Sequence, residues 1–366
     1  MRIYFHHNQN LNYIWRQWEQ GKFPSHLLYG ATHLSRFGID VILHQFTNQE
    51  RSRLSRALDT IKQIARCKEH FDAIYATRYN GIEFMILLRA LGLYRKPIIV
   101  WQHQPIERSR SWWRNLASRF FFRGIDHLFF FSERLMNVSV ASGKIRAGQA
   151  SVCPWGADLD FYDRLMKENN TVPHAGFIST GKENRDMPTL LSAFRSCPDT
   201  HLTLITAAKC CDTDYEEMLS KEELPSNVTL TINRDMWIPE LALRIWPHQC
   251  VCICCKETNY TVGLTTLIEA LAFGFPVIIS KNPNQPFDAQ EEGCGFSVPY
   301  GDVEGWKKAI RFITDNPEKA LLMGQRARSL AESTYNITNC AAVVAEAIKA
   351  AVAYSVPFRG QRLKEI

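Results

Sequence analysis

The chain has 366 residues, which is enough for two domains of ordinary size. Its hydrophobic content of 46% and charged content of 22% are typical of a globular protein and exclude a disordered one. The net charge of +6 is too small to indicate binding to nucleic acid. The sequence shows no secretory signal and no apolar run that is long enough to span a bilayer, so we expect a cytoplasmic protein.

Strand-length apolar runs alternate with helix-length stretches, which predicts two α/β domains built on mostly parallel sheets. In the first half the expected strands are Arg2–Phe5, Asp40–His44, Ala73–Ala76, Ile98–Trp101 and His127–Phe131. The expected helices there are His26–Phe37, Arg51–Cys67, Ile82–Leu91 and Ser111–Phe122. Gly38 follows the first of these helices as a C-terminal cap would.

The polar run Lys167–Pro173 separates this half from a second one with the same alternation. The expected strands are Gly176–Ser179, Leu202–Thr206, Val228–Ile232, Val251–Cys255, Val277–Ser280 and Gly295–Val298. The expected helices are Pro188–Arg195, Pro239–Trp246, Thr265–Phe273, Val303–Thr314, Pro317–Thr334 and Ile337–Val352. We therefore predict one domain over residues 1–168, onto which a C-terminal helix at 353–366 packs back, and a second domain over 169–352.

Four of the eleven cysteines lie in one apolar run, from Cys250 to Cys255. On a strand, Cys250, Cys252 and Cys254 point to one face, where free cysteines pack as small hydrophobic side chains. A zinc site usually combines such cysteines with a second, distant pair at similar spacing, which the chain lacks. We expect buried thiols here, no bound metal and no cofactor.

Two basic stretches stand out in the first half. Residues Arg108–Arg123 combine five arginines with Trp112, Trp113 and three phenylalanines, a pattern that is typical of a segment resting on an anionic membrane surface. The alternative is an amphipathic helix whose aromatic side chains enter the core and whose arginines are solvated. The second stretch, Arg51–Lys68, has a helical pattern and is interpreted as a solvated face. The first supports the hypothesis of peripheral contact with the inner face of the cell membrane.

The most specific stretch runs from Gly263 to Ile278. Gly263 ends a loop after a buried strand and lets the backbone approach a ligand closely. Thr265 and Thr266 open a helix, whose free N–H groups and positive dipole end favour a phosphate. Glu269 lies about one turn further on, where its carboxylate can accept hydrogen bonds from a ribose diol. The alternative for Glu269 is a solvated acid that only complements the helix dipole.

This stretch resembles the signature of family 4 glycosyltransferases with the GT-B fold, of the kind found in bacterial polysaccharide and glycolipid assembly: a glycine-rich loop followed by L-x-E-A-x-A-x-G-x-P-V. The resemblance implies two Rossmann-like domains that face a cleft. It also implies that Glu269 binds the ribose of a nucleotide-sugar and that Gly263, Leu264 and Thr265 hold the donor sugar and the diphosphate. Where the family carries another Glu, eight residues earlier, this chain has Thr261.

Other landmarks of the family follow in the expected order. The turn Cys153–Asp158 resembles the family's P-N-G-V-D turn, with Trp155 in place of Asn. The segment Ile178–Asp186 resembles the first strand and loop of the donor domain, and the resemblance places two cations on the diphosphate. The donor-side residues in this segment are Thr180, Gly181, Lys182 and Arg185. For the two cations the alternative is a solvated basic turn.

In the first half, His103 lies at the carboxyl end of the strand Ile98–Trp101, where the crevice of an open α/β sheet is found. It matches the histidine that similar enzymes present to the donor sugar; the alternative is a structural histidine with satisfied hydrogen bonds. His7 and Asn8 end the first strand and, with His103, form the expected acceptor side.

The resemblance implies a glycosyltransferase that moves a hexose from a nucleotide-diphosphate-sugar to the hydroxyl of a saccharide or lipid-linked acceptor. It assigns catalysis to His103, Lys182, Arg185 and Glu269, which act by positioning and charge stabilisation. Retention of the anomeric configuration and independence of metal ions are also implied. Two alternatives stay open: a nucleotide-sugar epimerase of the same fold, and a catalytically silent protein that binds a nucleotide-sugar.

Overall fold

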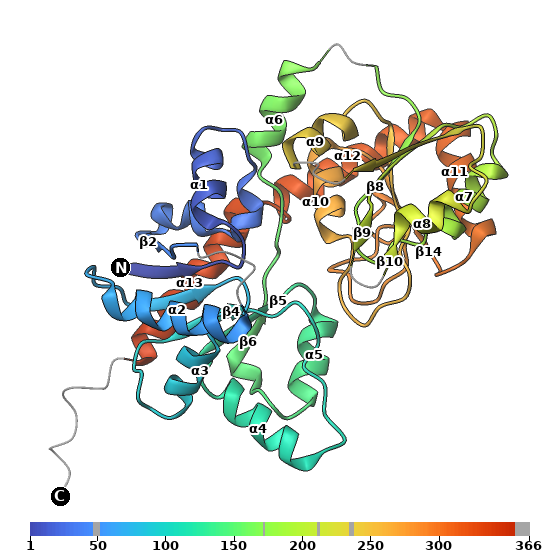
Figure 1. The fold of residues 1–366 in the computed structure, drawn as a ribbon. Coiled ribbons are helices and arrows are strands. Elements are labelled where there is room, and N and C mark those ends of the chain that lie inside the picture. Colours follow the sequence, from blue (N-terminus) through green and yellow to red (C-terminus); the bar gives the residue numbers. More distant parts are fainter. Residues whose placement is uncertain (47–51, 171–172, 211–212, 234–237, 356–366) are drawn as a thin grey trace, which may run out of the picture. The chain divides into compact units, whose positions relative to one another are not determined.

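The structure is a computed structural model that describes residues 1–46, 52–170, 173–210, 213–233 and 238–355. It divides into two compact units (Figure 1). Unit 1 comprises residues 1–20, 25–155 and the C-terminal residues from 337, and unit 2 comprises residues 21–24 and 156–336. Each unit holds one six-stranded sheet whose neighbouring strands are all parallel, which confirms the predicted α/β class.

The sheet of unit 1 has the strand order β2-β1-β3-β4-β5-β6. Its strands are β1 (Arg2–His6), β2 (Asp40–Leu43), β3 (Ala73–Ala76), β4 (Ile98–Trp101), β5 (His127–Phe130) and β6 (Ala150–Val152). The helices around it are α1 (Leu11–Glu19), α2 (Arg53–Arg66), α3 (Glu83–Ala90), α4 (Trp112–Phe122), α5 (Glu133–Ala141) and α13 (Ile337–Ser355). Three short 3-10 helices complete it: η1 (Ser25–Leu28), η2 (Ala31–Phe37) and η3 (Ala147–Gln149).

The segment between β1 and β2 differs from the prediction. The expected helix His26–Phe37 is two 3-10 helices, because Gly30 between them has a φ of +83° and packs against the backbone of Ala341. A Cβ at Gly30 would lie 3.0 Å from the Cα of Ala341, so the close approach of α13 requires glycine here. Gly38 caps η2 with a φ of +74°, as predicted.

Helix α13 packs against η2 and β3 within unit 1, and in Figure 1 it lies among the N-terminal elements of that unit. Its segment 337–354 has a mean hydropathy of 1.3 and is long enough to span a bilayer, although the sequence was expected to contain no such run. One face is buried, with Ala341, Val344 and Ile348 almost fully covered. We therefore treat α13 as a core helix. The predicted helix at 353–366 lies almost entirely outside the described residues.

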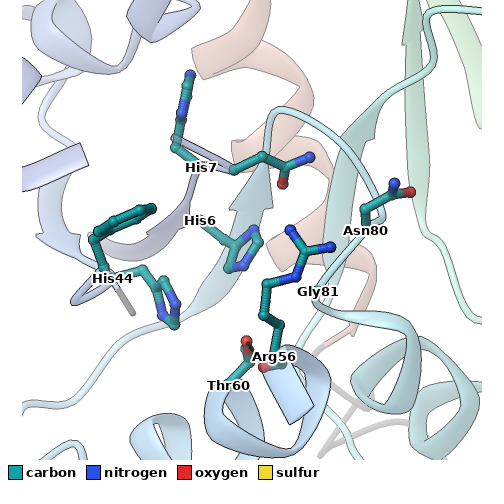
Figure 2. A pocket seen from close by; sticks show the side chains of 9 residues that line it. His6, His7, His44, Arg56, Thr60, Asn80 and Gly81 are labelled. Atoms are coloured by element: carbon teal, nitrogen blue, oxygen red, sulfur yellow. Dashed lines mark hydrogen bonds between the residues drawn. The ribbon is translucent and has the colours of Figure 1, made fainter. Parts of the chain in front are cut away.

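Polar side chains gather at the carboxyl ends of three neighbouring strands of unit 1. His6 ends β1, His44 follows β2, and Asn80 lies in the loop after β3. Together with Arg56 of α2 they line a pocket (Figure 2).

The sheet of unit 2 has the strand order β11-β8-β7-β12-β13-β14. Its strands are β7 (Phe177–Thr180), β8 (Leu202–Ala207), β11 (Val228–Asn233), β12 (Cys250–Ile253), β13 (Val277–Ser280) and β14 (Gly295–Val298). Its helices are α6 (Leu159–Glu168), α7 (Met187–Arg195), α8 (Tyr215–Ser220), α9 (Ile238–Ile245), α10 (Leu264–Phe273), α11 (Val303–Asp315) and α12 (Pro317–Ser333). A two-stranded antiparallel pair, β9 (Lys209–Cys210) and β10 (Thr213–Asp214), lies beside them.

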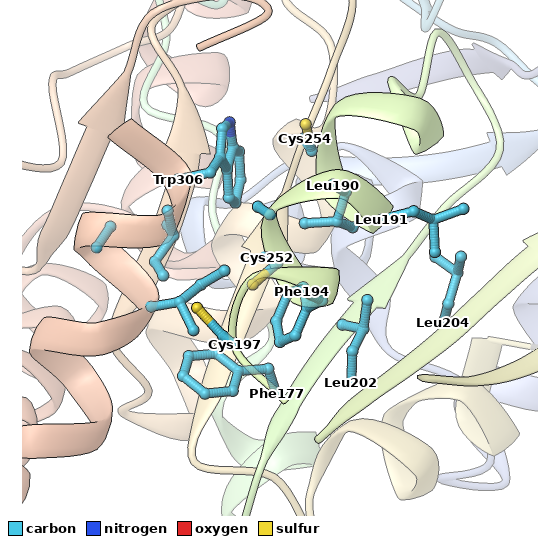
Figure 3. Close-up of a cluster of buried hydrophobic side chains, with 14 of the residues drawn as sticks. Phe177, Leu190, Leu191, Phe194, Cys197, Leu202, Leu204, Cys252, Cys254 and Trp306 are labelled. Atoms are coloured by element: carbon cyan, nitrogen blue, oxygen red, sulfur yellow. The ribbon is translucent and has the colours of Figure 1, made fainter. Parts of the chain in front are cut away.

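The core of unit 2 contains the cysteine-rich strand β12 (Figure 3). Cys250, Cys252 and Cys254 are buried in one cluster with Phe194 and Trp306, which confirms the prediction of buried thiols. Burial raises the pKa of the Cys252 and Cys254 thiols. They stay protonated and pack as small apolar groups.

The two units meet in the chain at residues 155 and 156, whereas the sequence predicted a boundary at 168. Helix α6 lies between these positions and belongs to unit 2, because it packs against α10. The Tyr162 hydroxyl of α6 donates a hydrogen bond to Glu269 of α10 over 3.1 Å.

Candidate functional site

The predicted donor-side residues of unit 2 come together where β7 and β12 end and α10 begins. Thr180 is the last residue of β7, and Gly181 follows it with a φ of +112°. Gly263 precedes α10 with a φ of +79°, a conformation in which glycine is strongly favoured. Because the first N–H groups of a helix have no partner within it, the backbone at the start of α10 presents hydrogen-bond donors.

Arg185 lies beside this helix start, and its side chain is 3% exposed. Nε donates to the carbonyl oxygen of Thr180 over 3.0 Å, and Nη1 to the Cys255 sulfur over 2.9 Å. Nη2 lies 3.4 Å from the Thr266 hydroxyl, in the first turn of α10. This excludes the solvated basic turn as a description of Arg185, although not of Lys182, whose side chain is exposed.

The Arg185 guanidinium has no carboxylate counter-charge among the residues that the structure describes. Burial raises the pKa of the Cys255 thiol although the arginine acts against it, so the sulfur carries no charge at neutral pH. A buried charge without an opposite charge is costly. The arrangement is therefore suited to receive an anion.

Both loop glycines are required by this packing. A Cβ at Gly181 would collide with the Arg185 guanidinium, and a Cβ at Gly263 would lie 2.5 Å from Ile253 Cγ2 and 3.1 Å from Arg185 Nη1. The positive φ angles disfavour any other residue independently of the space. The two glycines thus allow the buried arginine to reach the helix start.

Thr261 lies in the loop that leads to Gly263. Its hydroxyl donates to the backbone carbonyl of Asn284 over 2.7 Å, so the side chain is used to hold the loop. At this position the family 4 signature that the sequence resembles carries a Glu. Thr261 supplies no carboxylate at this position, and the exposed Glu257 lies earlier in the loop.

Glu269 is buried, with 2% of its surface exposed, which excludes the solvated acid considered from the sequence. Its Oε1 accepts the hydrogen bond from Tyr162. Burial raises the pKa of Glu269 to about 8, against a smaller opposite effect of the Tyr162 hydrogen bond. The side chain is therefore largely protonated at neutral pH and is directed toward α6 of its own unit.

In unit 1, His103 is half-buried after β4. Its Nε2 lies 2.9 Å from the carbonyl oxygen of Thr77 and its Nδ1 lies 3.3 Å from Arg78 Nη2. Since a carbonyl only accepts and a guanidinium only donates, Nε2 carries the proton and Nδ1 accepts. Burial, together with the Arg78 charge, lowers the pKa of His103 to about 3. The ring is neutral, and both of its nitrogens have partners.

His7 and Asn8, the other two residues expected on the acceptor side, line the pocket of Figure 2, whereas His103 is not part of its lining. Nε2 of His7 lies 3.1 Å from the carbonyl oxygen of Leu27, and its Nδ1 accepts from the Gln9 amide over 3.0 Å. Burial lowers the pKa of His7 to about 4. This side chain is neutral and fixed in orientation.

Sequence reasoning missed most of this pocket. Arg56 was interpreted as part of a solvated face, yet its side chain is only partly exposed and its Nε is buried. His6, His44 and Asn80 come from three separate strand ends and received no role. The one usable signal was that polar residues follow neighbouring parallel strands, whose carboxyl ends share an edge of the sheet.

Most aromatic side chains of α4 do not enter the core, contrary to one of the sequence interpretations. Trp112 is 77% exposed, Trp113 is 56% exposed and Leu116 is 60% exposed. Phe122 is the buried aromatic residue of this helix. The exposed apolar side chains alternate with arginines along the helix.

Comparison with known proteins finds a family model that matches part of the chain. Residues 167–330 match the family model described as glycosyl transferases group 1. This segment contains β7, Arg185, the start of α10 and Glu269. No curated protein matches the chain at a significant level.

Several solved structures share the fold at low identity. Anabaena HepE in complex with UDP is 16% identical, over 96% of this chain and 100% of that one, with a TM-score of 0.67. Sucrose-phosphate synthase from Thermosynechococcus elongatus is 15% identical, over 97% and 100%, with a TM-score of 0.71. A glycosyltransferase from Rickettsia africae is 13% identical, over 96% and 98%, with a TM-score of 0.68. These similarities confirm the predicted GT-B fold.

Proposed function

We propose that the chain is a glycosyltransferase that transfers a hexose from a nucleotide-diphosphate-sugar to an acceptor hydroxyl, and the match of residues 167–330 to the model of glycosyl transferases group 1 supports this. The observation that carries this proposal is Arg185, a buried guanidinium without a carboxylate partner among the described residues, at the start of α10. The bound UDP of the similar HepE structure is consistent with a nucleotide donor.

The diphosphate is proposed to bind against the N–H groups of Gly263, Leu264 and Thr265, next to Arg185. A guanidinium binds phosphate oxygens through charge-assisted hydrogen bonds, and the helix start adds its own positive potential. Both would stabilise the negative charge that develops on the leaving nucleoside diphosphate. The exposed Lys182 is proposed to add a mobile cation at the same loop. These groups supply positive charge without a metal ion, so we propose metal-independent transfer.

Glu269 is proposed to anchor the ribose, and the L-x-E-A-x-A-x-G-x-P-V pattern around it supports membership of family 4, whose enzymes retain the anomeric configuration. Its burial means that the ribose reaches the carboxyl only after side chains around it move. His103 is proposed as the contribution of unit 1 to binding the transferred sugar. Because its ring is neutral and both nitrogens have partners, we assign it a positioning role rather than that of a general base.

A lipid-linked saccharide or glycolipid acceptor is proposed from the surface of α4. Exposed tryptophans beside arginines suit the interface of an anionic membrane, where indole rings lie at the level of the headgroups. The Arg114 guanidinium lies 5.4 Å from the Trp113 ring, so charge and aromatic surface are presented together. The enzyme would thus work in polysaccharide or glycolipid assembly.

A panel of UDP-, GDP- and dTDP-sugars tests the donor site by thermal unfolding. A ligand that binds only the folded state raises the melting temperature, by an amount that corresponds to about 2.7 kcal/mol at a hundred times the dissociation constant. We expect one base to give this increase and Arg185→Met to abolish it. Arg195→Met, which changes an exposed arginine of the same unit, is the matched control.

Arg185→Met also separates a ligand-binding role from a structural one. If the guanidinium serves an anion, its replacement by an apolar side chain of similar length removes an unpaired buried charge, and the ligand-free protein keeps its melting temperature. The proposed donor site would be refuted if no nucleotide-sugar raised the melting temperature of the wild-type protein. It would also be refuted if a nucleotide-sugar raised the melting temperature of Arg185→Met as much as that of the wild-type protein.

A further inference from the structure

The pocket of unit 1 is small and polar (Figure 2). Its walls come from the ends of β1 and β2, the loop after β3 and the helix α2, which contribute His6, His44, Asn80 and Arg56. The cavity has a volume of about 30 Å³. A single water needs roughly 10–15 Å³ by the same measure, so the space fits a compact polar group and not a sugar ring.

Two buried polar atoms of this lining lack a hydrogen-bond partner among the described residues: Nδ1 of His6 and Nε of Arg56. The His6 side chain is 4% exposed, so solvent does not replace the missing partner. In Figure 2 the Arg56 side chain extends from α2 toward His6. Buried polar atoms are nearly always hydrogen-bonded, so these two atoms are available to a polar group that enters the cavity.

The charge of the lining decides which kind of ligand fits. Burial lowers the pKa of His6 well below its usual value, with smaller contributions from His44, His7 and Arg56. Burial also lowers the pKa of His44 to about 4, although Asp59 acts against it. The histidines are therefore neutral at pH 7, and the Arg56 guanidinium is the formal charge of the lining.

A positive guanidinium opposes a metal cation and attracts an anion. Within the described parts of the chain, no three His, Cys, Asp or Glu side chains are grouped so that they could hold a metal ion. Neutral imidazoles can donate N–H to an oxyanion, and the amide of Asn80 lies in the same lining, whereas the Thr60 hydroxyl donates to the carbonyl oxygen of Arg56. The donor set matches phosphate or carboxylate oxygens.

Gly81 allows the loop after β3 to pass close to the His6 imidazole. It has a φ of +97°, and a Cβ added there would lie 2.9 Å from both Cε1 and Nε2 of His6. The loop after β3 thus approaches the imidazole as closely as a glycine allows, which keeps the ring at the cavity wall.

We propose that this pocket binds the phosphate or carboxylate group of an anionic acceptor, with Arg56 as the charged ligand and His6 as a neutral hydrogen-bond donor. The assignment of the anion to the acceptor rests on the proposed glycosyltransferase function. It makes the pocket a determinant of acceptor class: a charged acceptor is selected over its neutral analogue.

Isothermal titration calorimetry at low ionic strength tests the pocket with four probes: inorganic phosphate, acetate, glucose 6-phosphate and glucose. We expect the wild-type protein to bind at least one anion and to bind glucose at least about tenfold more weakly than glucose 6-phosphate. Arg56→Met should weaken anion binding by at least about tenfold. Arg66→Met, which removes an exposed arginine of the same helix, should leave it unchanged.

The comparison of the four probes distinguishes an anionic group carried by the acceptor from a free anion. Binding of glucose 6-phosphate without inorganic phosphate supports a group carried by the acceptor, and equal binding of both supports recognition of the anion itself. Failure of every anion to bind the wild-type protein, or undiminished binding by Arg56→Met, would overturn the proposal. If Arg56→Met does not fold, Arg56→Lys keeps the charge but not the fork geometry and should bind anions at intermediate strength.

The nucleotide-sugar response is measured on the same proteins, because Arg56 lies in unit 1 and the donor residues lie in unit 2. We expect Arg56→Met to keep that response. If the wild-type protein shows no nucleotide response but binds anions through Arg56, the donor assignment fails while the anion pocket stands.

Discussion

Replacing Glu269 by glutamine should change the pH dependence of stability. Burial raises the pKa of Glu269 from 4.5 to about 8, so the folded protein keeps a proton that the unfolded chain releases above pH 4.5. The stabilisation linked to this group is complete below pH 4.5 and is lost as the pH rises toward 8. At ~1.36 kcal/mol for each pH unit, the loss between pH 4.5 and pH 7 is about 3 kcal/mol.

Glutamine has nearly the same shape, is neutral at every pH, and can accept the hydrogen bond from Tyr162. Glu269→Gln should therefore lie within about 1 kcal/mol of the wild-type stability at pH 5 and exceed it by about 3 kcal/mol at pH 7. Urea unfolding followed by circular dichroism from pH 5 to pH 8 measures this difference. Glu257→Gln, at an exposed glutamate of the same unit, is the control and should show no such trend.

A stability difference between Glu269→Gln and the wild-type protein that stays constant from pH 5 to pH 8 would refute the reasoning. It would mean that the carboxyl ionises in the folded state as it does in the unfolded chain. In that case Glu269 would lie in a more polar environment than its contacts with α6 indicate.

Three further results are expected. Gly181→Ala should lower the free energy of unfolding by about 2–3 kcal/mol and abolish nucleotide binding, because its methyl group meets Arg185, whereas Gly143, with a φ of +71°, has open space around it, so that Gly143→Ala should cost about 1 kcal/mol; equal costs in urea titrations would contradict this. The thiols of the β12 cluster should react with a thiol reagent at pH 8 only after unfolding, since burial raises their pKa; rapid labelling of the native protein would exclude the buried environment. The double variant Trp112→Ser/Trp113→Ser should lose co-sedimentation with anionic vesicles, and equal sedimentation of variant and wild-type protein would remove the membrane contact proposed for α4.

The sequence predicted best those strands that are apolar runs between proline, glycine and polar residues. The strands Ala73–Ala76, Ile98–Trp101 and Val277–Ser280 have the predicted ends, since each is buried on both faces of a parallel sheet. Helix α1 was not among the predicted helices, although Asn10 caps it by accepting a hydrogen bond from the Tyr13 amide. In such segments the secondary structure depends on tertiary packing, which the local sequence does not reveal.

The features of the candidate site also fall into those that the local sequence predicts and those that it does not. Gly263 and Thr265 follow from the local pattern of a glycine before a helix, which sequence alone carries. The burial of Arg185 and of Glu269 does not, because it depends on Thr180, Cys255 and Tyr162, which are distant in the chain. The pocket around Arg56 was not predicted for the same reason, since its lining residues are distant in the chain.

The proposed function depends on the binding of a nucleotide diphosphate by Arg185 and the start of α10. Its most direct test compares, by calorimetry, the affinity of the nucleoside diphosphate selected by the donor panel with that of the corresponding nucleoside. We expect the diphosphate to strengthen binding to the wild-type protein by at least about a hundredfold, and Arg185→Met to reduce this advantage by at least about tenfold. An advantage that is equally large in Arg185→Met, or absent from the wild-type protein, would contradict it.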